Sequence, residues 1–506
     1  MNVLYIIADQ WRGECLSRLG HDHVRTPHLD ALAEDGVQFN QHYTQASPCG
    51  PSRTSVHTGM YMHNHRSFLN GTPLDARHTN VAKEARAAGH DPVLFGYTDI
   101  SLDPRHYVIE NGYEGVLPGM DPVCLLDGSY APWIARLKIK GYDVPDRGSD
   151  MFQPKRNFPG ADGKESTYAP AQYTAEDSNT AFLVDEAITY IDGQEGKPWF
   201  AHIAFISPHP PFVVPEPYHD MYNADDMPLP SRQPTPEQEA AQHPWIEYFL
   251  DQQTSAGHTI GIPPKDKPLS DAEAQQTKAT YFGMISEVDA QVGRLIAYLK
   301  ENDMYDDTLI VFTSDHGEHM GDHWMYSKYS YFQQTFHIPM IVRDPTAAAD
   351  AARGTIVDEF TESIDVMPTI LNYLGVDVPA QCDGHSLIPF CHGSPPENWR
   401  DAYHAAFDMR GLSNGEIVLP LGLAPDECVV YVLCDKRYKY VHFATLSPLL
   451  FDMQNDPGEF ENLAADPEHQ GKVAEYSQKM LSWLMKSDGD ELTDMHLTTS
   501  GVSRWS

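Results

Sequence analysis

Five continuous apolar runs predict the strands of a buried sheet. They lie at residues 3–8, 92–97, 199–206, 308–313 and 338–342. Each run is far shorter than a membrane span and lacks the alternation of a half-buried strand, so we expect strands covered on both faces. Such strands are typical of parallel sheets, whose crossover helices cover both sides.

Segments with helical spacing lie between these runs. Residues 26–36 have the Thr-Pro start and the Gly end of a capped helix. Residues 177–192 and 281–299 repeat apolar side chains every three or four positions, which predicts helices with one face in the core. The alternation of strand and helix predicts an α/β fold: a doubly wound, mostly parallel sheet flanked by helices.

The pattern changes near residue 390. Short apolar runs then follow one another closely before a last helical segment, which predicts a smaller antiparallel sheet plus a helix. We expect a catalytic α/β domain at residues 1–390, with inserted loops at about 100–175 and 213–270, where Gly, Pro and polar residues prevail. Residues 391–506 would form the C-terminal unit, which ends in a polar tail.

Charge and cysteine content disfavour several classes of protein. The formal net charge of −37 disfavours binding to nucleic acid or to an anionic membrane. The seven cysteines include no Cys-X-X-Cys pair, so neither a disulfide framework nor a structural zinc site is expected. The strand-like N-terminus has no basic leader and no apolar run has membrane-spanning length, so we expect a soluble, cytoplasmic protein.

Polar residues that follow the predicted strands form a candidate metal site. Ligands of open α/β sheets bind at the carboxyl ends of the strands. The candidates at these ends are Asp9, Gln10, Asp315 and His316. Their oxygen and nitrogen donors suit a hard or borderline divalent cation, such as Ca²⁺ or Mn²⁺. We therefore expect one divalent metal ion at this edge of the sheet.

Residues 47–59 place a thiol beside a fixed cation. Pro51 suits the first turn of a helix and Gly59 suits its end, so Cys49 would lie just before the helix. Arg53 follows Cys49 by four residues, and one helical turn brings its guanidinium back toward the sulfur. A helix N-terminus with an arginine beside it is a site for an anion.

The same stretch resembles the sulfatase signature Cys-X-Pro-Ser-Arg followed by Thr-Gly. Ser-Asp-His-Gly-Glu at 314–318 and Leu-Phe-Asp-Met-Gln-Asn-Asp-Pro at 450–457 also fall in sulfatase order, and together these motifs cover nearly the whole chain. Asp-Gln at 9–10 and Asp-His at 315–316 are most similar to the bacterial phosphonate monoester hydrolase branch, which includes related arylsulfatases. The resemblance implies an alkaline-phosphatase/sulfatase-like fold.

The resemblance also implies roles for the matching residues. Cys49 would be converted to formylglycine by a formylglycine-generating enzyme or its equivalent, and would join the four metal ligands named above. Arg53 would hold the formylglycine hydrate. The residues implied to contact the substrate oxyanion or the leaving group are Asn70, Tyr97, His209 and Lys328. Asp99 stands where the branch often has threonine, and a carboxylate there would alter substrate preference.

The leading hypothesis is a formylglycine- and metal-dependent arylsulfatase that is promiscuous toward phosphonate monoesters and phosphodiesters. Its substrate would be a small anionic ester. The alternative enzyme has phosphonate monoester or phosphodiester hydrolysis as its primary activity. The alternative of another class is a non-catalytic anion- or metal-binding relative. The long inserts and the C-terminal tail favour a homodimer or a homotetramer.

Overall fold

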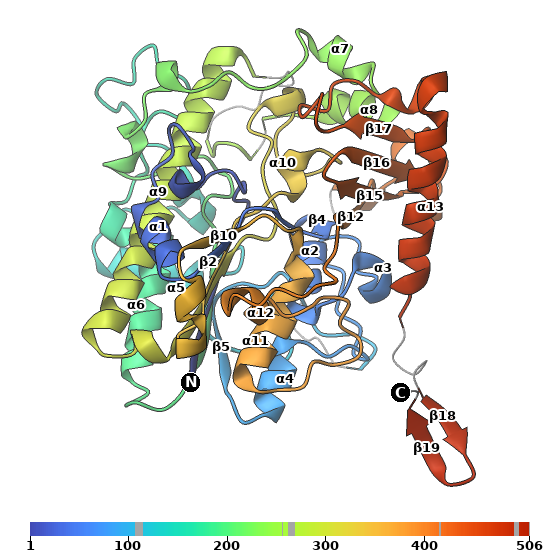
Figure 1. Ribbon diagram of the computed structural model, residues 1–506. Helices are drawn as coiled ribbons and strands as arrows, with labels where there is room; N and C mark the ends of the chain where they lie inside the picture. Colours follow the sequence, from blue (N-terminus) through green and yellow to red (C-terminus); the bar gives the residue numbers. More distant parts are fainter. Residues whose placement is uncertain (107–114, 256, 262–268, 414–415, 490–494, 505–506) are drawn as a thin grey trace.

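The computed structural model describes residues 1–106, 115–255, 257–261, 269–413, 416–489 and 495–504. The strands of its largest sheet are β1 (Asn2–Ala8), β2 (Val37–Phe39), β5 (Pro92–Gly96), β6 (Asp121–Leu125), β7 (Phe200–Phe205), β8 (Thr308–Thr313), β9 (Met340–Arg343) and β10 (Thr355–Val357). Their spatial order is β10-β2-β9-β8-β1-β7-β5-β6 (Figure 1). Neighbours pair in parallel, except that β9 runs antiparallel to β2 and β8. The predicted doubly wound, mostly parallel sheet is confirmed.

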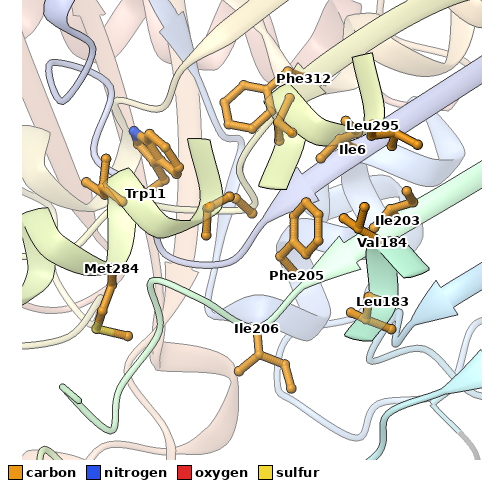
Figure 2. Packing of buried hydrophobic residues seen from close by; sticks show 14 of the residues in the cluster. Ile6, Trp11, Leu183, Val184, Ile203, Phe205, Ile206, Met284, Leu295 and Phe312 are labelled. Carbon is orange, nitrogen blue, oxygen red and sulfur yellow. The ribbon is translucent and has the colours of Figure 1, made fainter. Parts of the chain in front are cut away.

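Helices cover both faces of this sheet. One face carries α1 (Pro27–Glu34), α6 (Asn179–Asp192) and α9 (Asp271–Glu301), and the other carries α2 (Cys49–Thr58), α4 (Val81–Ala87) and α11 (Val366–Leu374). Along β1, Ile6 packs into the first core and Tyr5 into the second. Figure 2 shows Ile6 and Phe312 beside residues of α6 and α9. Burial on both sides explains the continuous apolar runs.

The smaller sheet and its helix are also present. The strands are β4 (Ala46–Ser47), β12 (Ala402–Asp408), β15 (Val429–Asp435), β16 (Tyr438–Phe443) and β17 (Leu449–Asp452), in the order β17-β16-β15-β12-β4. Four of them pair antiparallel, and α13 (Gln470–Lys486) packs against them (Figure 1). The fifth strand, β4, pairs in parallel with β12, so the small sheet holds the backbone that enters α2.

The two stretches expected to be loops contain regular elements. The first includes β6 and α5 (Ala131–Ile139), and the second includes α7 (Pro236–Ala240) and α8 (Pro244–Gln252). The remaining short elements are β3 (His42–Tyr43), α3 (Met62–His65), α10 (Gln333–Phe336), β11 (Thr361–Glu362), α12 (Ile388–Cys391), β13 (Gly411–Ser413) and β14 (Glu416–Val418). The C-terminal segment forms a hairpin of β18 (Met495–Thr498) and β19 (Gly501–Arg504), which extends away from the body in Figure 1. Of the helices in the described ranges, none combines the length and apolar character needed to cross a membrane.

Candidate active site

Cys49 is the first residue of α2, so the helix begins two residues before the proline start expected from the sequence. The backbone N–H of Ser52 donates to the carbonyl oxygen of Pro48 at 3.1 Å and closes the first turn. The N–H of Gly50 donates to Oδ1 of Asn70 at 2.8 Å. The Ser52 bond includes Cys49 in the helix, and the Gly50 bond satisfies an amide that a helix start leaves unpaired. Gly59 ends it with a positive φ of 69°, as predicted.

Four potential metal ligands meet at the ends of β1 and β8 and the start of α2. They are Asp9, Cys49, Asp315 and His316, whose donor atoms all lie within 4.8 Å of one another and which are all buried. Sγ of Cys49 lies 3.2 Å from Nε2 of His316. Oδ1 of Asp9 is buried and has no hydrogen-bond partner in the described structure. A buried, unpaired carboxylate oxygen among other donors fits a bound cation.

Arg53 lies between the two carboxylates of this cluster. Its Nε donates to Asp315 Oδ2 at 2.9 Å, and its Nη2 donates to Asp9 Oδ2 at 3.2 Å. Its Nη1 donates to the carbonyl oxygen of Tyr97, and the guanidinium lies 4.3 Å from the centroid of that ring. The whole side chain is buried. Arg53 therefore acts as counter-ion to two buried carboxylates that would otherwise repel each other.

The protonation state of His316 suits metal binding. Burial lowers the pKa of His316 to about 4, so the imidazole is neutral near pH 7. Its Nδ1 donates to the carbonyl oxygen of Gly317 at 3.0 Å, which leaves Nε2 with a lone pair facing the cluster. Burial, together with Asp315, raises the pKa of Asp9. Burial and then Asp9 raise the pKa of the Cys49 thiol, so a thiolate is disfavoured there.

Lys328 connects Gln10 with Cys49. Its Nζ donates to Gln10 Oε1 at 2.8 Å and lies 3.2 Å from Cys49 Sγ. Burial opposes the charge of this ammonium, but the nearby carboxylates of Asp9 and Asp315 contribute to a pKa of Lys328 above its ordinary value. The lysine is therefore a permanent cation beside residue 49. Gln10 itself is held in the left-handed region, with a φ of 68°.

A cleft opens directly over Cys49. It has a volume of about 580 Å³ and is lined by polar and aromatic residues, among them Asn70, His209, Phe249, Gln252, Lys328 and Tyr329. A second lobe of about 450 Å³ shares Asn70, Phe249, Gln252 and Tyr329, and extends to Trp245 and Arg410. The cluster of potential metal ligands thus adjoins a cleft with two lobes.

The structure places the predicted substrate residues in two groups. Asn70, His209 and Lys328 line the cleft. Tyr97 instead donates its hydroxyl to Asp9 Oδ2, which ties it to the metal cluster. Burial, followed by Lys328, lowers the pKa of His209 to about 3. Its Nδ1 donates to the carbonyl oxygen of Pro210 at 2.6 Å, so Nε2 is an acceptor.

Some residues of the site escaped sequence reasoning. Glu318 accepts a hydrogen bond from the Gln10 amide, although the sequence indicated only that its motif was polar. Phe249 belongs to α8, inside a stretch expected to be a loop, and no sequence pattern placed it at the cleft. Asp99, in contrast, was named from the sequence, and it lies close enough to Cys49 to help raise the pKa of the thiol; its φ is 57°.

Comparison with known proteins gives matches along the whole chain. The family model described as Sulfatase matches residues 1–376, and the model described as N-sulphoglucosamine sulphohydrolase, C-terminal, matches residues 321–486. The multifunctional alkaline phosphatase superfamily protein PehA of Trinickia caryophylli is 40% identical over 516 residues, which cover 99% of this chain and 98% of that protein. An arylsulfatase of Clostridium perfringens is 27% identical over 510 residues, which cover 97% and 96%. The crystal structure of the phosphonate monoester hydrolase of Agrobacterium radiobacter matches with a TM-score of 0.93 at 40% identity, covering 100% of this chain and 99% of that one.

Proposed function

The chain belongs to the sulfatase family, within the alkaline phosphatase superfamily, and we propose from its site that it hydrolyses phosphonate monoesters and phosphodiesters. It is an enzyme that acts on ester bonds, as its relatives are. The observation that carries the proposal is the buried cluster of Asp9, Asp315 and His316 around residue 49, with Arg53 and Lys328 as fixed cations. Such a centre neutralises a small anionic ester and presents it to a nucleophile.

Two observations favour phosphonate monoesters and phosphodiesters over sulfate monoesters as the primary substrates. The phosphonate monoester hydrolase is 40% identical to this chain, whereas the arylsulfatase is 27% identical. A phosphonate monoester or a phosphodiester also carries two organic groups on its charged centre, which suits the two lobes of the cleft. Sulfate monoesters, with one organic group, are the second candidate, favoured by Ser52 in the Cys-X-Pro-Ser-Arg signature. This order reverses the one favoured by the sequence.

The family uses a metal ion and a formylglycine, and the donor set of this chain suits both. In our proposal Asp9, Gln10, Asp315 and His316 hold one Ca²⁺ or Mn²⁺, and Cys49 is converted to formylglycine by a formylglycine-generating enzyme or its equivalent. The metal and the hydrated aldehyde would supply an oxygen nucleophile and charge neutralisation. The raised pKa of the Cys49 thiol supports this assignment, because an unmodified thiol would be a poor nucleophile here.

The chain's own cationic and polar groups would orient the ester. Lys328, 3.2 Å from Sγ of residue 49, is placed to stabilise negative charge on the departing oxygen. His209 is neutral with an acceptor nitrogen, so it would orient a donor group of the substrate rather than protonate the leaving group. Asn70 uses its oxygen on Gly50, which leaves its N–H groups for a substrate oxygen.

Rates on three esters with the same aryl leaving group test the proposal. We expect kcat/KM for the aryl phosphonate and the diaryl phosphate to exceed that for the aryl sulfate at least tenfold. A higher value for the sulfate would reverse our order. Mass spectrometry of the peptide that contains Cys49 tests the nucleophile, because an unmodified thiol in fully active protein contradicts it. Cys49→Ala should bind Mn²⁺ more weakly and lose nearly all turnover.

We also propose a homo-oligomer in which the β18–β19 hairpin contacts a second copy. Leu497 is 83% exposed and Val502 is 66% exposed on this hairpin, and Met485 at the end of α13 is 73% exposed. A lone two-stranded hairpin is marginally stable in water, so contact with another subunit would stabilise it. Measurement of the mass of the oligomer in solution decides between a dimer and a tetramer.

A further inference from the structure

Glu318 is a buried carboxylate that contacts Gln10, next to the cluster of potential metal ligands. Its Oε2 accepts a hydrogen bond from Nε2 of Gln10. Its Oε1 accepts the backbone N–H groups of Met320 at 3.1 Å and Ser327 at 2.6 Å. Ser327 directly precedes Lys328, so one carboxylate holds both the Gln10 amide and the loop that delivers the active-site lysine. The side chain is fully buried, so water does not compete for these bonds.

The orientation of the Gln10 amide matters because its two ends have similar size but opposite polarity. In the observed orientation the oxygen faces Lys328, whose Nζ lies 2.8 Å away. After a half-turn, Gln10 would direct its NH₂ group toward this ammonium and toward the metal cluster, where only an acceptor is favourable. The Glu318 oxygen that accepts on the nitrogen side excludes that half-turn.

We propose that Glu318 is a positioning residue that fixes the Gln10 amide with its oxygen toward Lys328 and the metal. The inference rests on the proposed function, because it takes Gln10 as a metal ligand. Within the described residues, the other bonds of Gln10 hold only its backbone: its N–H donates to Asp315 Oδ1 at 3.1 Å, and Tyr281 donates to its carbonyl oxygen at 2.7 Å. Orientation of the side-chain amide is therefore left to Glu318 and Lys328.

Glu318→Gln separates this role from support of the loop. The new side chain keeps an oxygen for the N–H groups of Met320 and Ser327, so the loop remains closed. Its NH₂ group meets the NH₂ group of Gln10, and the Gln10 amide must turn to relieve the contact. Loss of a group that orients a metal ligand typically lowers metal affinity 10- to 100-fold. We expect Mn²⁺ affinity about tenfold or more below that of the wild type, with kcat reduced more than KM is raised.

Calorimetric titration of metal-free protein with Mn²⁺ provides the test. The wild type, Glu318→Gln, Gln10→Ala and the double variant form a mutant cycle. If Glu318 acts through Gln10, its substitution should change affinity less than about twofold in the Gln10→Ala background. An equal loss in both backgrounds would show that the carboxylate acts through space or through the loop, and would overturn the proposal. An Mn²⁺ affinity of Glu318→Gln equal to that of the wild type would also overturn the proposal.

Asp322→Asn is the matched control. Asp322 is buried in the same loop, but its side chain accepts the N–H of Ser231 at 2.8 Å and pairs with Arg12 at 2.9 Å. We expect it to lower the melting temperature without changing Mn²⁺ affinity. A wild type that binds neither Mn²⁺ nor Ca²⁺ would refute the metal site itself, which is a different result from an unaffected Glu318→Gln.

The swapped pair, Gln10→Glu with Glu318→Gln, keeps the test decisive if the single variant folds poorly. The swap restores the hydrogen bond with donor and acceptor exchanged, and restores the charge of the pair. Recovery of Mn²⁺ affinity to within about threefold of the wild type supports the proposal. An affinity still tenfold or more below the wild type overturns it.

Discussion

Replacing Arg53 by methionine should destabilise the metal-free protein strongly. Arg53 is fully buried and contacts Asp9 at 3.2 Å and Asp315 at 2.9 Å, and both carboxylates are also fully buried. The substitution keeps the volume of the side chain but removes the cation between two anions. Removal of one partner from a buried ion pair costs about 3–5 kcal/mol, because the remaining charge is buried without compensation.

This cost converts into a measurable shift of melting temperature. Unfolding entropy is about 2.1 cal/mol/K per residue, or about 1 kcal/mol/K for 506 residues that unfold together. The melting temperature of Arg53→Met at pH 7.5 should therefore fall by about 3–5 °C. The pKa of Asp9 is already raised by burial and by Asp315, and loss of Arg53 raises it further. The folded variant then binds more protons than the unfolded chain, so its stability increases as pH falls.

Thermal melting of metal-free protein at pH 7.5 and pH 5.5, with and without Mn²⁺, tests the reasoning. The deficit of Arg53→Met should shrink at pH 5.5, and Mn²⁺ should stabilise the variant more than the wild type. Arg343→Met is the control, because Arg343 is also buried but its partners Asp306 and Asp35 are 94% and 36% exposed. Its deficit should not differ between pH 7.5 and pH 5.5 or change with Mn²⁺. The same behaviour in Arg53→Met would show that Arg53 contributes packing alone.

Three further outcomes are expected. Lys328→Met should lower kcat/KM more for esters of weakly acidic alcohols than for 4-nitrophenyl esters; a uniform loss across leaving groups would restrict Lys328 to binding. Burial raises the pKa of Glu287 from 4.5 to about 7. The free energy of unfolding of the wild type therefore falls by about 3 kcal/mol as the pH rises between these values. Denaturant unfolding should show Glu287→Gln gaining that amount of stability relative to the wild type by pH 8. A difference in stability that does not change with pH would contradict the raised pKa. Deletion of residues 490–506 should reduce the mass of the oligomer in light scattering, whereas an unchanged mass would exclude the hairpin as a contact.

Five strands of the main sheet, β1, β5, β7, β8 and β9, could be predicted because burial on both faces leaves a direct pattern in the sequence, whereas the short strands β2, β6 and β10 were not predicted. β1, β7 and β8 all coincide with continuous apolar runs. The small strand β4 left no such pattern, because two residues have no periodicity and their pairing with β12 is set by tertiary contacts. The amphipathic helix α8 was missed for another reason: Pro244 and the surrounding polar residues obscured an apolar face that packs Trp245 and Ile246.

The residues of the candidate site also divide into those that the sequence predicted and those that it did not. Its reactive groups stand at strand ends or in a motif, so residue type and position predicted them. Their supports depend on contacts between distant parts of the chain, such as the hydroxyl of Tyr97 on Asp9 or the amide of Gln10 on Glu318. Such contacts have no sequence spacing to reveal them. For this reason Tyr97 could be named as a site residue without its observed role at Asp9.

The net negative charge of the protein repels the anionic substrate that we propose. The residues that line the cleft limit this repulsion. The net charge is −37, yet no carboxylate of the described residues lines the cleft, and Lys328 does. Because Asp9 and Asp315 are paired with Arg53, repulsion of an approaching anionic ester comes mainly from the surface of the protein, and salt screens such charges over about 8 Å at physiological ionic strength. We expect kcat/KM to rise as NaCl increases from about 10 to 150 mM, while kcat changes little, because salt would relieve repulsion during encounter without entering the buried cluster. A fall in kcat/KM would mean that the cations of the cleft already dominate the field that the approaching ester meets.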